Sequence, residues 1–237
     1  MSKPEGTDSD SQGHTPPTEI TVQHNAHFKA ELPVDDQQDF EDATRGFIAS
    51  EPDLIIRNRN GYPIWDMTAY RFIDDEAPSS VNPSLWRQAK LNNIHGLFEV
   101  TKGVYQLRGY DLANLTIIEG KTGWIIVDPL TAEETAAAAF EFAKKYLEPK
   151  PVVAVIFTHS HADHFGGIAA IISAEDVLEK GVRIVAPEGF MEESISENVI
   201  AGVAMRRRAQ FMYGKRLTIS ERGHVDTGLG KTPANGK

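Results

Sequence analysis

The sequence predicts an α/β fold in which strands and helices alternate and pack as layers. Residues 152–157 form a continuous apolar run rich in β-branched side chains, which is typical of a strand buried on both faces. Strand and helix patterns alternate before and after this run. A cluster of histidine and aspartate residues follows it at once, so that the strand end would serve as a rigid platform for a site.

The first hundred residues predict a flexible arm followed by an extension that packs on the core. Residues 1–27 are rich in Ser, Thr, Pro and Gly and poor in apolar residues, which favours a flexible arm. Within the extension, residues 28–100, apolar side chains recur at helical spacing over 35–49 and predict a short amphipathic helix. Residues 54–65 favour a strand–turn–strand, and a proline at position 83 favours the start of a helix that runs to Leu91.

Residues 101–237 hold the regular alternation and predict the first part of a larger domain. The expected strands are 103–108, 115–119, 124–127, 152–157 and 182–185. The expected helices are an alanine-rich one from 131 to 147, a short one through Ala170 and a long one over about 188–212. Thr131 and Glu134 match a capping box at the start of the first of these helices. Residues 221–237 hold four glycines and predict a loop that stops in mid-course.

Composition excludes several classes of protein. The chain has 237 residues, 41% of them apolar, which is enough for one domain with a hydrophobic core and an extension. A net charge of −10 argues against a nucleic-acid partner, since such proteins are usually basic. No apolar run is long enough to span a membrane, and the first residues lack the basic start and apolar stretch of a secretory signal, so the expected location is cytoplasmic. Without cysteine, any metal ion must be held by His, Asp and Glu.

Four potential metal ligands lie within six positions directly after the predicted buried strand: His159, His161, Asp163 and His164. In extended chain His159 and His161 point to the same side and can grip one ion together. Asp163 and His164 project differently and can reach a second ion nearby. Imidazole and carboxylate suit zinc, and two divalent ions close together can activate a water for hydrolysis. The two glycines after Phe165 would let the backbone turn tightly into the next helix.

The sequence of residues 158–167, Thr-His-Ser-His-Ala-Asp-His-Phe-Gly-Gly, resembles the signature of the metallo-β-lactamase superfamily. Residues 114–120, 123–130 and 196–202 look like the group III alkyl sulfatases within it, which hydrolyse dodecyl sulfate, and the similarity runs from about His27 to the last residue. The resemblance implies a metallo-β-lactamase-like αββα sandwich. This chain would supply about its first half, with an N-terminal extension.

The resemblance also implies a sulfuric ester hydrolase that uses two Zn²⁺ ions and converts alkyl sulfates to alcohol and sulfate. By that analogy His159 and His161 bind the first zinc, and Asp163 and His164 bind the second, with Asp163 as the catalytic candidate. Asp128, at the end of its strand, matches an early acidic position of the superfamily. It would support the ligand loop from behind the metal site, although a plain strand-end aspartate is the alternative interpretation.

Full alkyl sulfatases are much longer than this chain. The resemblance implies that two further glutamate ligands, another histidine, a helical dimerisation domain and a lipid-transfer-like domain follow the matched region. A homodimer is therefore expected only of the full-length enzyme, and some relatives are exported. With two ligands per metal ion, the isolated chain is expected to bind metal weakly and to show little or no activity.

Three alternatives stay open. His224, in the sequence Gly-His-Val-Asp-Thr-Gly, resembles the turn that brings a third histidine to the metal in other members of the superfamily. The chain would then be a thioesterase-like or lactamase-like hydrolase. Otherwise His224 is expected to be a solvated loop histidine, because the alkyl-sulfatase resemblance implies that it lies in an intervening loop. It can also be an inactive truncated remnant. Separately, the run from Arg206 to Arg208 favours a solvated helix face, with contact to a sulfate or an acidic partner as the second possibility.

Overall fold

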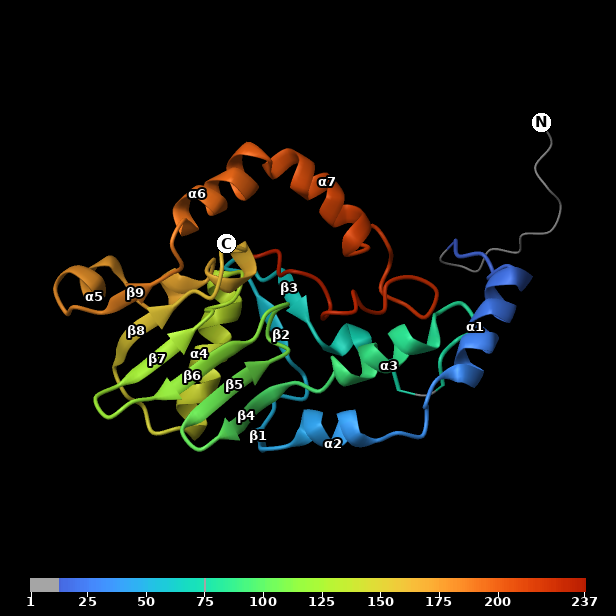
Figure 1. Ribbon diagram of the computed structural model, residues 1–237, viewed down its shortest axis with the longest axis horizontal. Coiled ribbons are helices and arrows are strands. Elements are labelled where there is room, and N and C mark those ends of the chain that lie inside the picture. Colours follow the sequence, from blue (N-terminus) through green and yellow to red (C-terminus); the bar gives the residue numbers. More distant parts are fainter. Residues whose placement is uncertain (1–12, 75) are drawn as a thin grey trace.

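The computed structural model describes residues 13–74 and 76–237, and it confirms a mixed α/β fold (Figure 1). A seven-stranded sheet has the order β1-β4-β5-β6-β7-β8-β9, and a separate pair of strands has the order β2-β3. The large sheet comprises β1 (Phe47–Ala49), β4 (Gly96–Thr101), β5 (Val104–Arg108), β6 (Leu115–Glu119), β7 (Trp124–Val127), β8 (Val152–Ile156) and β9 (Arg183–Val185). The pair comprises β2 (Ile55–Arg57) and β3 (Pro63–Asp66), which confirms the predicted strand–turn–strand.

The sheet changes from antiparallel to parallel at β7. Strands β1 to β7 run antiparallel to their neighbours, whereas β7, β8 and β9 are mutually parallel. Parallel neighbours need a crossover, and helix α4 (Glu133–Tyr146) supplies the one between β7 and β8. The carboxyl ends of β7 and β8 therefore meet at one edge of the sheet, which is where the ligand cluster follows.

The core lies between the large sheet and α4. Alternate residues of β6 and β7 are buried there, and the core also contains the small side chains Ala136, Ala139 and Ala143 of the helix. The prediction that 152–157 is buried on both faces is only partly right. Val155 is fully buried and the other residues of β8 are half-buried, because α4 covers only one face of the sheet.

The N-terminal region departs from the prediction. Part of the expected flexible arm, residues 1–12, lies outside the described residues, but α1 (Glu19–Glu31) is a helix. The side chain of Thr18 caps it by accepting a hydrogen bond from the backbone of Thr21, and the Asn25 side chain donates to the carbonyl of Ser79 at 2.8 Å. The helix predicted over 35–49 is shorter, as α2 (Gln38–Thr44), because the chain turns into edge strand β1 to pair with β4.

Helix α3 (Pro83–Leu91) is as predicted, but the capping box proposed at Thr131 is wrong. The Thr131 hydroxyl donates instead to the buried carboxylate of Asp111 at 2.8 Å, and α4 begins two residues later. Asp111 also accepts hydrogen bonds from the Thr135 hydroxyl and from the backbone of Ala234. The Asp111 carboxylate thus connects the loop after β5, the start of α4 and the final segment. The Thr131 hydroxyl bonds to this carboxylate and is not available to cap the helix.

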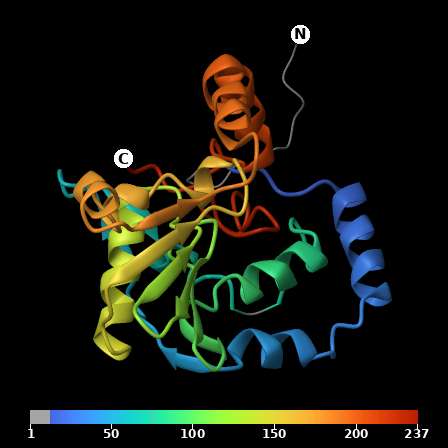
Figure 2. The same ribbon diagram turned by 60° about the vertical axis from the view of Figure 1, so that its left-hand side comes forward.

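The predicted long helix over 188–212 is an arm made of three consecutive pieces, which arches over the rest of the chain (Figures 1 and 2). They are α6 (Phe190–Ile195), a π-helical segment η4 (Ser196–Ile200) and α7 (Gly202–Met212). The helix expected through Ala170 is only the 3₁₀ turn η3 (Ile168–Ala170), followed by α5 (Ala174–Leu178). Residues 221–237 form no helix or strand, as expected. No helix within 13–74 and 76–237 has the length and apolar character needed to cross a membrane.

Candidate metal centre

The turn after β7 carries Asp128 in a backbone conformation that few residue types adopt. Its φ is 55°, in the left-handed region that aspartate tolerates better than most side chains, and Leu130 follows with a φ of 64°. The backbone amide of Asp128 donates to the carbonyl of Ile156 on β8 at 3.0 Å. This bond fixes the turn of β7 against the strand that leads into the ligand cluster.

The carboxylate of Asp128 organises the ligand loop. It accepts hydrogen bonds from the backbone amide and the hydroxyl of Thr158, at 2.8 and 2.7 Å, and lies 2.8 Å from Nδ1 of His164. Burial raises the pKa of the Asp128 carboxyl, but the hydrogen bonds from His164 and Thr158 outweigh it and hold the pKa below its usual range. Asp128 is thus an anion that contacts both His164 and Thr158, and its role as a supporting group for a metal site stays a prediction.

Gly166 and Gly167 serve close packing rather than a tight turn. Neither has a positive φ. A Cβ atom at Gly166 would lie 2.1 Å from the carbonyl oxygen of Thr131, and one at Gly167 would lie 2.3 Å from that of Pro129. The chain after the ligand cluster therefore packs directly on the turn that carries Asp128, and a larger residue at either glycine would push the two apart.

The four ligand candidates lie together in two pairs. Nε2 of His159 is 3.0 Å from Nδ1 of His161, so these two rings meet as the period of extended chain predicts. Nε2 of His164 is 3.3 Å from a carboxylate oxygen of Asp163. The ring centroids of His159 and His164 are 4.0 Å apart, which brings the two pairs side by side.

The pairs suit a divalent ion by donor type but supply only two donors each. Imidazole nitrogen and carboxylate oxygen are ordinary zinc ligands. Among residues 13–74 and 76–237, no group of three or more His, Cys, Asp or Glu side chains is arranged to hold one ion. If each pair held one ion, it would be one donor short of the three protein ligands usual in a catalytic zinc site.

His164 is protonated at neutral pH when no metal is bound. Burial lowers the pKa of its ring, but hydrogen bonds to Asp128 and Asp163 outweigh burial and raise the pKa to about 9. A divalent ion must displace this proton to use the ring as a ligand.

The raised pKa of His164 predicts how stability of the metal-free protein changes with pH. The ionic contacts stabilise the fold fully below the unfolded-state pKa of about 6.5, and this stabilisation is lost as pH rises through about 9. In chelator-treated protein we expect the free energy of unfolding of wild type to exceed that of His164→Gln by roughly 2–3 kcal/mol at about pH 5.5. Near about pH 10 this difference should be lost. Urea unfolding of both proteins measures it. A constant difference across this range would contradict the assignment.

A cavity of ≈ 600 Å³ opens beside the ligand cluster and is part polar, part apolar. Its polar lining includes His161, Asp163, His164, Glu197, Arg208 and Tyr213, and its apolar lining includes Leu112, Met205, Met212, Leu229 and Pro233. The arm above the sheet supplies most of the second wall. Of the arginine run, Arg208 lines the cavity, although all three side chains are exposed. The resemblance included residues 196–202 but gave Glu197 no role, and nothing in the sequence pointed to Tyr213, because only the folding of the arm brings these two residues to the cluster.

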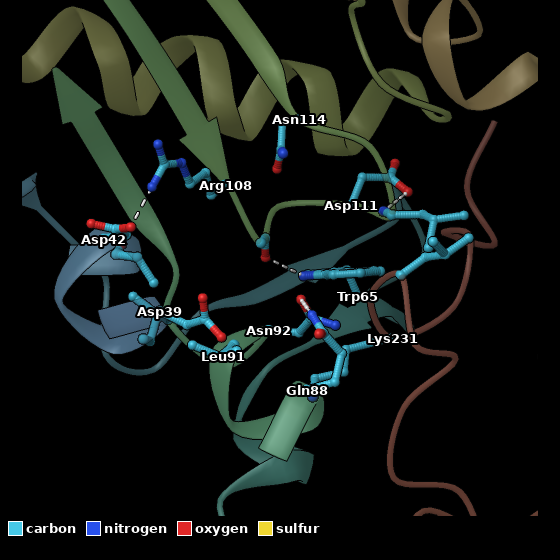
Figure 3. A pocket seen from close by; sticks show the side chains of 16 residues that line it. Asp39, Asp42, Trp65, Gln88, Leu91, Asn92, Arg108, Asp111, Asn114 and Lys231 are labelled. Carbon is cyan, nitrogen blue, oxygen red and sulfur yellow. Dashed lines mark hydrogen bonds between the residues drawn. The ribbon is translucent and has the colours of Figure 1, made fainter. Parts of the chain in front are cut away.

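A second cavity of ≈ 460 Å³ lies next to the first, and Leu112, Asn114 and Leu229 line both (Figure 3). Its other lining residues include Trp65 on β3, Arg108 on β5, Asp111 in the loop after β5 and Lys231 in the final segment, all labelled in Figure 3. None of the four ligand candidates lines it.

His224 lies in a separate buried cluster. Its ring is 4% exposed, and its Nδ1 is 3.1 Å from the hydroxyl of Tyr70, within an apolar group that includes Trp86 and Val225. Burial lowers the pKa of the ring. The ring hydrogen-bonds with the Tyr70 hydroxyl, and His224 does not line the cavity beside the ligand cluster. Its burial contradicts the alternative expectation of a solvated loop histidine.

The chain is similar to curated alkylsulfatases. The chain is 48% identical over 217 residues to the alkyl/aryl-sulfatase BDS1 of Saccharomyces cerevisiae, which covers 91% of this chain and 34% of the relative. It is 49% identical over 223 residues to a linear primary-alkylsulfatase of Pseudomonas sp., covering 93% of this chain and 33% of the relative. The chain spans about a third of the length of these curated relatives.

Solved structures support the same fold. The structure of the stereoselective inverting sec-alkylsulfatase Pisa1 from Pseudomonas sp. superposes with a TM-score of 0.88 at 48% identity, over 95% of this chain and 36% of that one. The family model of the metallo-beta-lactamase superfamily matches residues 108–232, which include the turn at Asp128, the ligand loop and the arm. The resemblance to alkyl sulfatases expected from the sequence is therefore confirmed, and the chain belongs to the metallo-beta-lactamase superfamily.

Proposed function

We propose that this chain supplies metal ligands and part of the substrate cavity of a hydrolase that cleaves alkyl sulfate esters to alcohol and sulfate. One observation carries the proposal: a single cavity is lined by His161, Asp163 and His164 of the ligand cluster, by the cation of Arg208 and by a set of apolar side chains. An alkyl sulfate has the complementary parts, an anionic head next to an ester bond and an apolar chain. Relatives that match over nine-tenths of this chain are named alkylsulfatases.

Each part of the cavity has a role in this proposal. His159 and His161 would hold one ion, and Asp163 with His164 would hold a second, with zinc as the expected metal. When bound, divalent ions supply Lewis-acid stabilisation of charged oxygens and a route to an activated water. Asp128 would orient His164 and, through Thr158, the start of the ligand loop.

The cation and the apolar wall would select the substrate. The guanidinium of Arg208 can donate charged hydrogen bonds to sulfate oxygens. Met205, Met212 and Leu229 would remove the alkyl chain from water, at about 0.8 kcal/mol for each buried methylene group. Affinity should therefore increase with chain length until the cavity is filled.

Arg208→Gln is expected to weaken binding of octyl sulfate to the zinc-loaded chain by roughly tenfold, because a charged hydrogen bond at an exposed site is lost. Isothermal titration with octyl sulfate and with octanol measures it. Arg207→Gln is the matched control, since Arg207 is exposed on the same helix and does not line the cavity. Octanol binding should be unchanged in both variants. If both variants lost the same affinity for octyl sulfate, or if octanol binding weakened as well, Arg208 would not be the residue that binds the sulfate group.

Turnover tests the reaction class. Release of alcohol from alkyl sulfates is expected to be slow in this chain, because each pair of ligand candidates has two donors, and to be lost in His159→Ala. A screen with lactam and thioester substrates, repeated on His224→Ala, tests the alternative hydrolase. Activity on those substrates that depends on His224 would replace the present proposal. A chain with no activity on any substrate and no stoichiometric zinc uptake by calorimetry would be the inactive remnant.

Two earlier expectations stay predictions. The sequence predicts a cytoplasmic location, and the resemblance predicts a homodimer only in a longer enzyme. Size-exclusion chromatography with light scattering on this chain tests the second, with a monomer as the expected result.

A further inference from the structure

Both nitrogens of the His161 ring have a partner in the structure. Nδ1 lies 3.0 Å from Nε2 of His159, inside the ligand cluster. Nε2, on the outer side of the ring, lies 3.5 Å from a carboxylate oxygen of Glu197. The inner nitrogen is thus the one shared with the other histidine, and the outer one faces an anion.

Glu197 reaches this position because the arm widens into a π-helix. The segment η4 (Ser196–Ile200) interrupts the α-helical arm, and such single π-turns occur frequently at functional sites. The Glu197 side chain is turned inward and is 27% exposed, whereas Val199 and Ile200 on the same segment are 72% and 79% exposed. One turn earlier, the Ser194 hydroxyl donates to the carbonyl of Ser160, which anchors the arm to the ligand loop.

The hydrogen bonds around His159 set its tautomer. The Thr158 hydroxyl donates its only proton to Asp128, so its oxygen must accept from Nδ1 of His159, 2.9 Å away. Nδ1 of His159 then carries the ring proton and Nε2 presents a lone pair. This lone pair points at Nδ1 of His161.

We propose that Glu197 is a positioning residue that sets the complementary tautomer of His161. A carboxylate at Nε2 favours the proton there, so that Nδ1 also presents a lone pair, and the lone pairs of both rings then converge on one point that a cation can fill. Without Glu197 the ring proton of His161 can move to Nδ1. There it would form a hydrogen bond to Nε2 of His159 and occupy the place between the two nitrogens that a metal ion needs. This inference rests on the metal-binding role proposed for the two histidines.

A titration with Co²⁺, followed by visible absorption, tests the effect on metal binding. Removing such a supporting carboxylate typically lowers metal affinity by about 10–100-fold. We expect Glu197→Ala to show a loss of this size and Glu197→Gln a smaller loss, because glutamine keeps an acceptor but not the charge. Glu193→Gln is the control, an exposed glutamate one turn away on α6, and should bind as wild type does.

The tautomer can be read without any metal. Long-range ¹H–¹⁵N correlation spectra of chelator-treated protein should show the neutral form of the His161 ring protonated at Nε2 in wild type. In Glu197→Ala its proton should shift toward Nδ1. His161→Gln identifies the signals, and unfolding midpoints check that the variants are folded.

The outcomes separate the two levels of the argument. If wild type takes up no Co²⁺ but the tautomer shifts as expected, the metal-binding proposal fails and the positioning role of Glu197 stands. If Co²⁺ binds equally well to wild type and to Glu197→Ala, or if the His161 tautomer is the same in both, the inference about Glu197 is wrong.

Discussion

Asp128→Ala is expected to destabilise the metal-free protein by about 3 kcal/mol and to weaken metal binding at His164 by about 10–100-fold. Three effects contribute to the loss of stability. The amide and hydroxyl of Thr158 lose a buried acceptor, and His164 loses one of its two anionic partners. Alanine is also strained at a φ of 55°, which costs roughly a further 1 kcal/mol.

Two further variants separate these effects. Asp128→Gly accepts the backbone conformation but removes the carboxylate, so its difference from Asp128→Ala measures the backbone strain. Asp128→Asn tolerates a positive φ and keeps one acceptor for Thr158, but it cannot pair ionically with His164. We expect the order of stability to be wild type, asparagine, glycine and alanine.

Urea unfolding in the presence of a chelator measures stability, and Co²⁺ titration of the same proteins measures metal binding. Asparagine should retain most of the stability but lose metal affinity, because a neutral amide cannot raise the basicity of His164. If asparagine and wild type bound Co²⁺ with the same affinity, Asp128 would be a strand-end aspartate with a structural role only.

The local parts of this site were predictable from sequence because they depend on neighbours in the chain. The spacing of His159 and His161 after an apolar strand is enough to predict that they share a side, and the structure has them 3.0 Å apart. Strand patterns between 103 and 127 likewise gave β5, β6 and β7 with nearly the right bounds, because their alternation reflects burial on one face.

The long-range parts were not predictable in this way. Glu197 lies 36 residues after His161. No local sequence pattern predicts the π-turn that brings its carboxylate next to the His161 ring. Thr131 has the sequence of a helix cap, but a buried carboxylate 20 residues earlier competes for its hydroxyl. The N-terminal segment that was predicted to be flexible, residues 1–27, is partly helical. Helix α1 contacts residues 76–79 through the side chains of Asn25 and Lys29, and composition alone cannot reveal such a contact.

Lys231→Met is expected to destabilise the fold by about 3–5 kcal/mol, because it leaves the Asp226 carboxylate buried without its counter-charge. Nζ of Lys231 lies 3.0 Å from Asp226, and the two side chains are 3% and 0% exposed. The same ammonium donates to the carbonyl of Ala89 and lies 4.7 Å above the ring of Tyr70. Burial lowers the pKa of Lys231, and Asp226 opposes this change.

The buried Lys231–Asp226 ion pair also holds in place the segment that separates the two cavities. The Asn92 side chain, just after α3, donates to Asp226 at 2.9 Å, so the pair fastens residues 226–231 to that helix. Leu229, between the two charged residues, lines both cavities, and Lys231 lines the one in Figure 3. Lys231→Met should therefore weaken octyl sulfate and octanol binding alike, unlike Arg208→Gln, which should affect only the sulfate.

A double variant distinguishes loss of the pair from loss of packing. In Lys231→Met with Asp226→Leu no charge is left buried, and we expect most of the lost stability to return. Lys121→Met, at an exposed position, is the control for the substitution itself and should change the free energy of unfolding by less than about 0.5 kcal/mol. If the double variant were as unstable as Lys231→Met alone, shape rather than charge would hold the loop, and the ion pair would not be what positions Leu229.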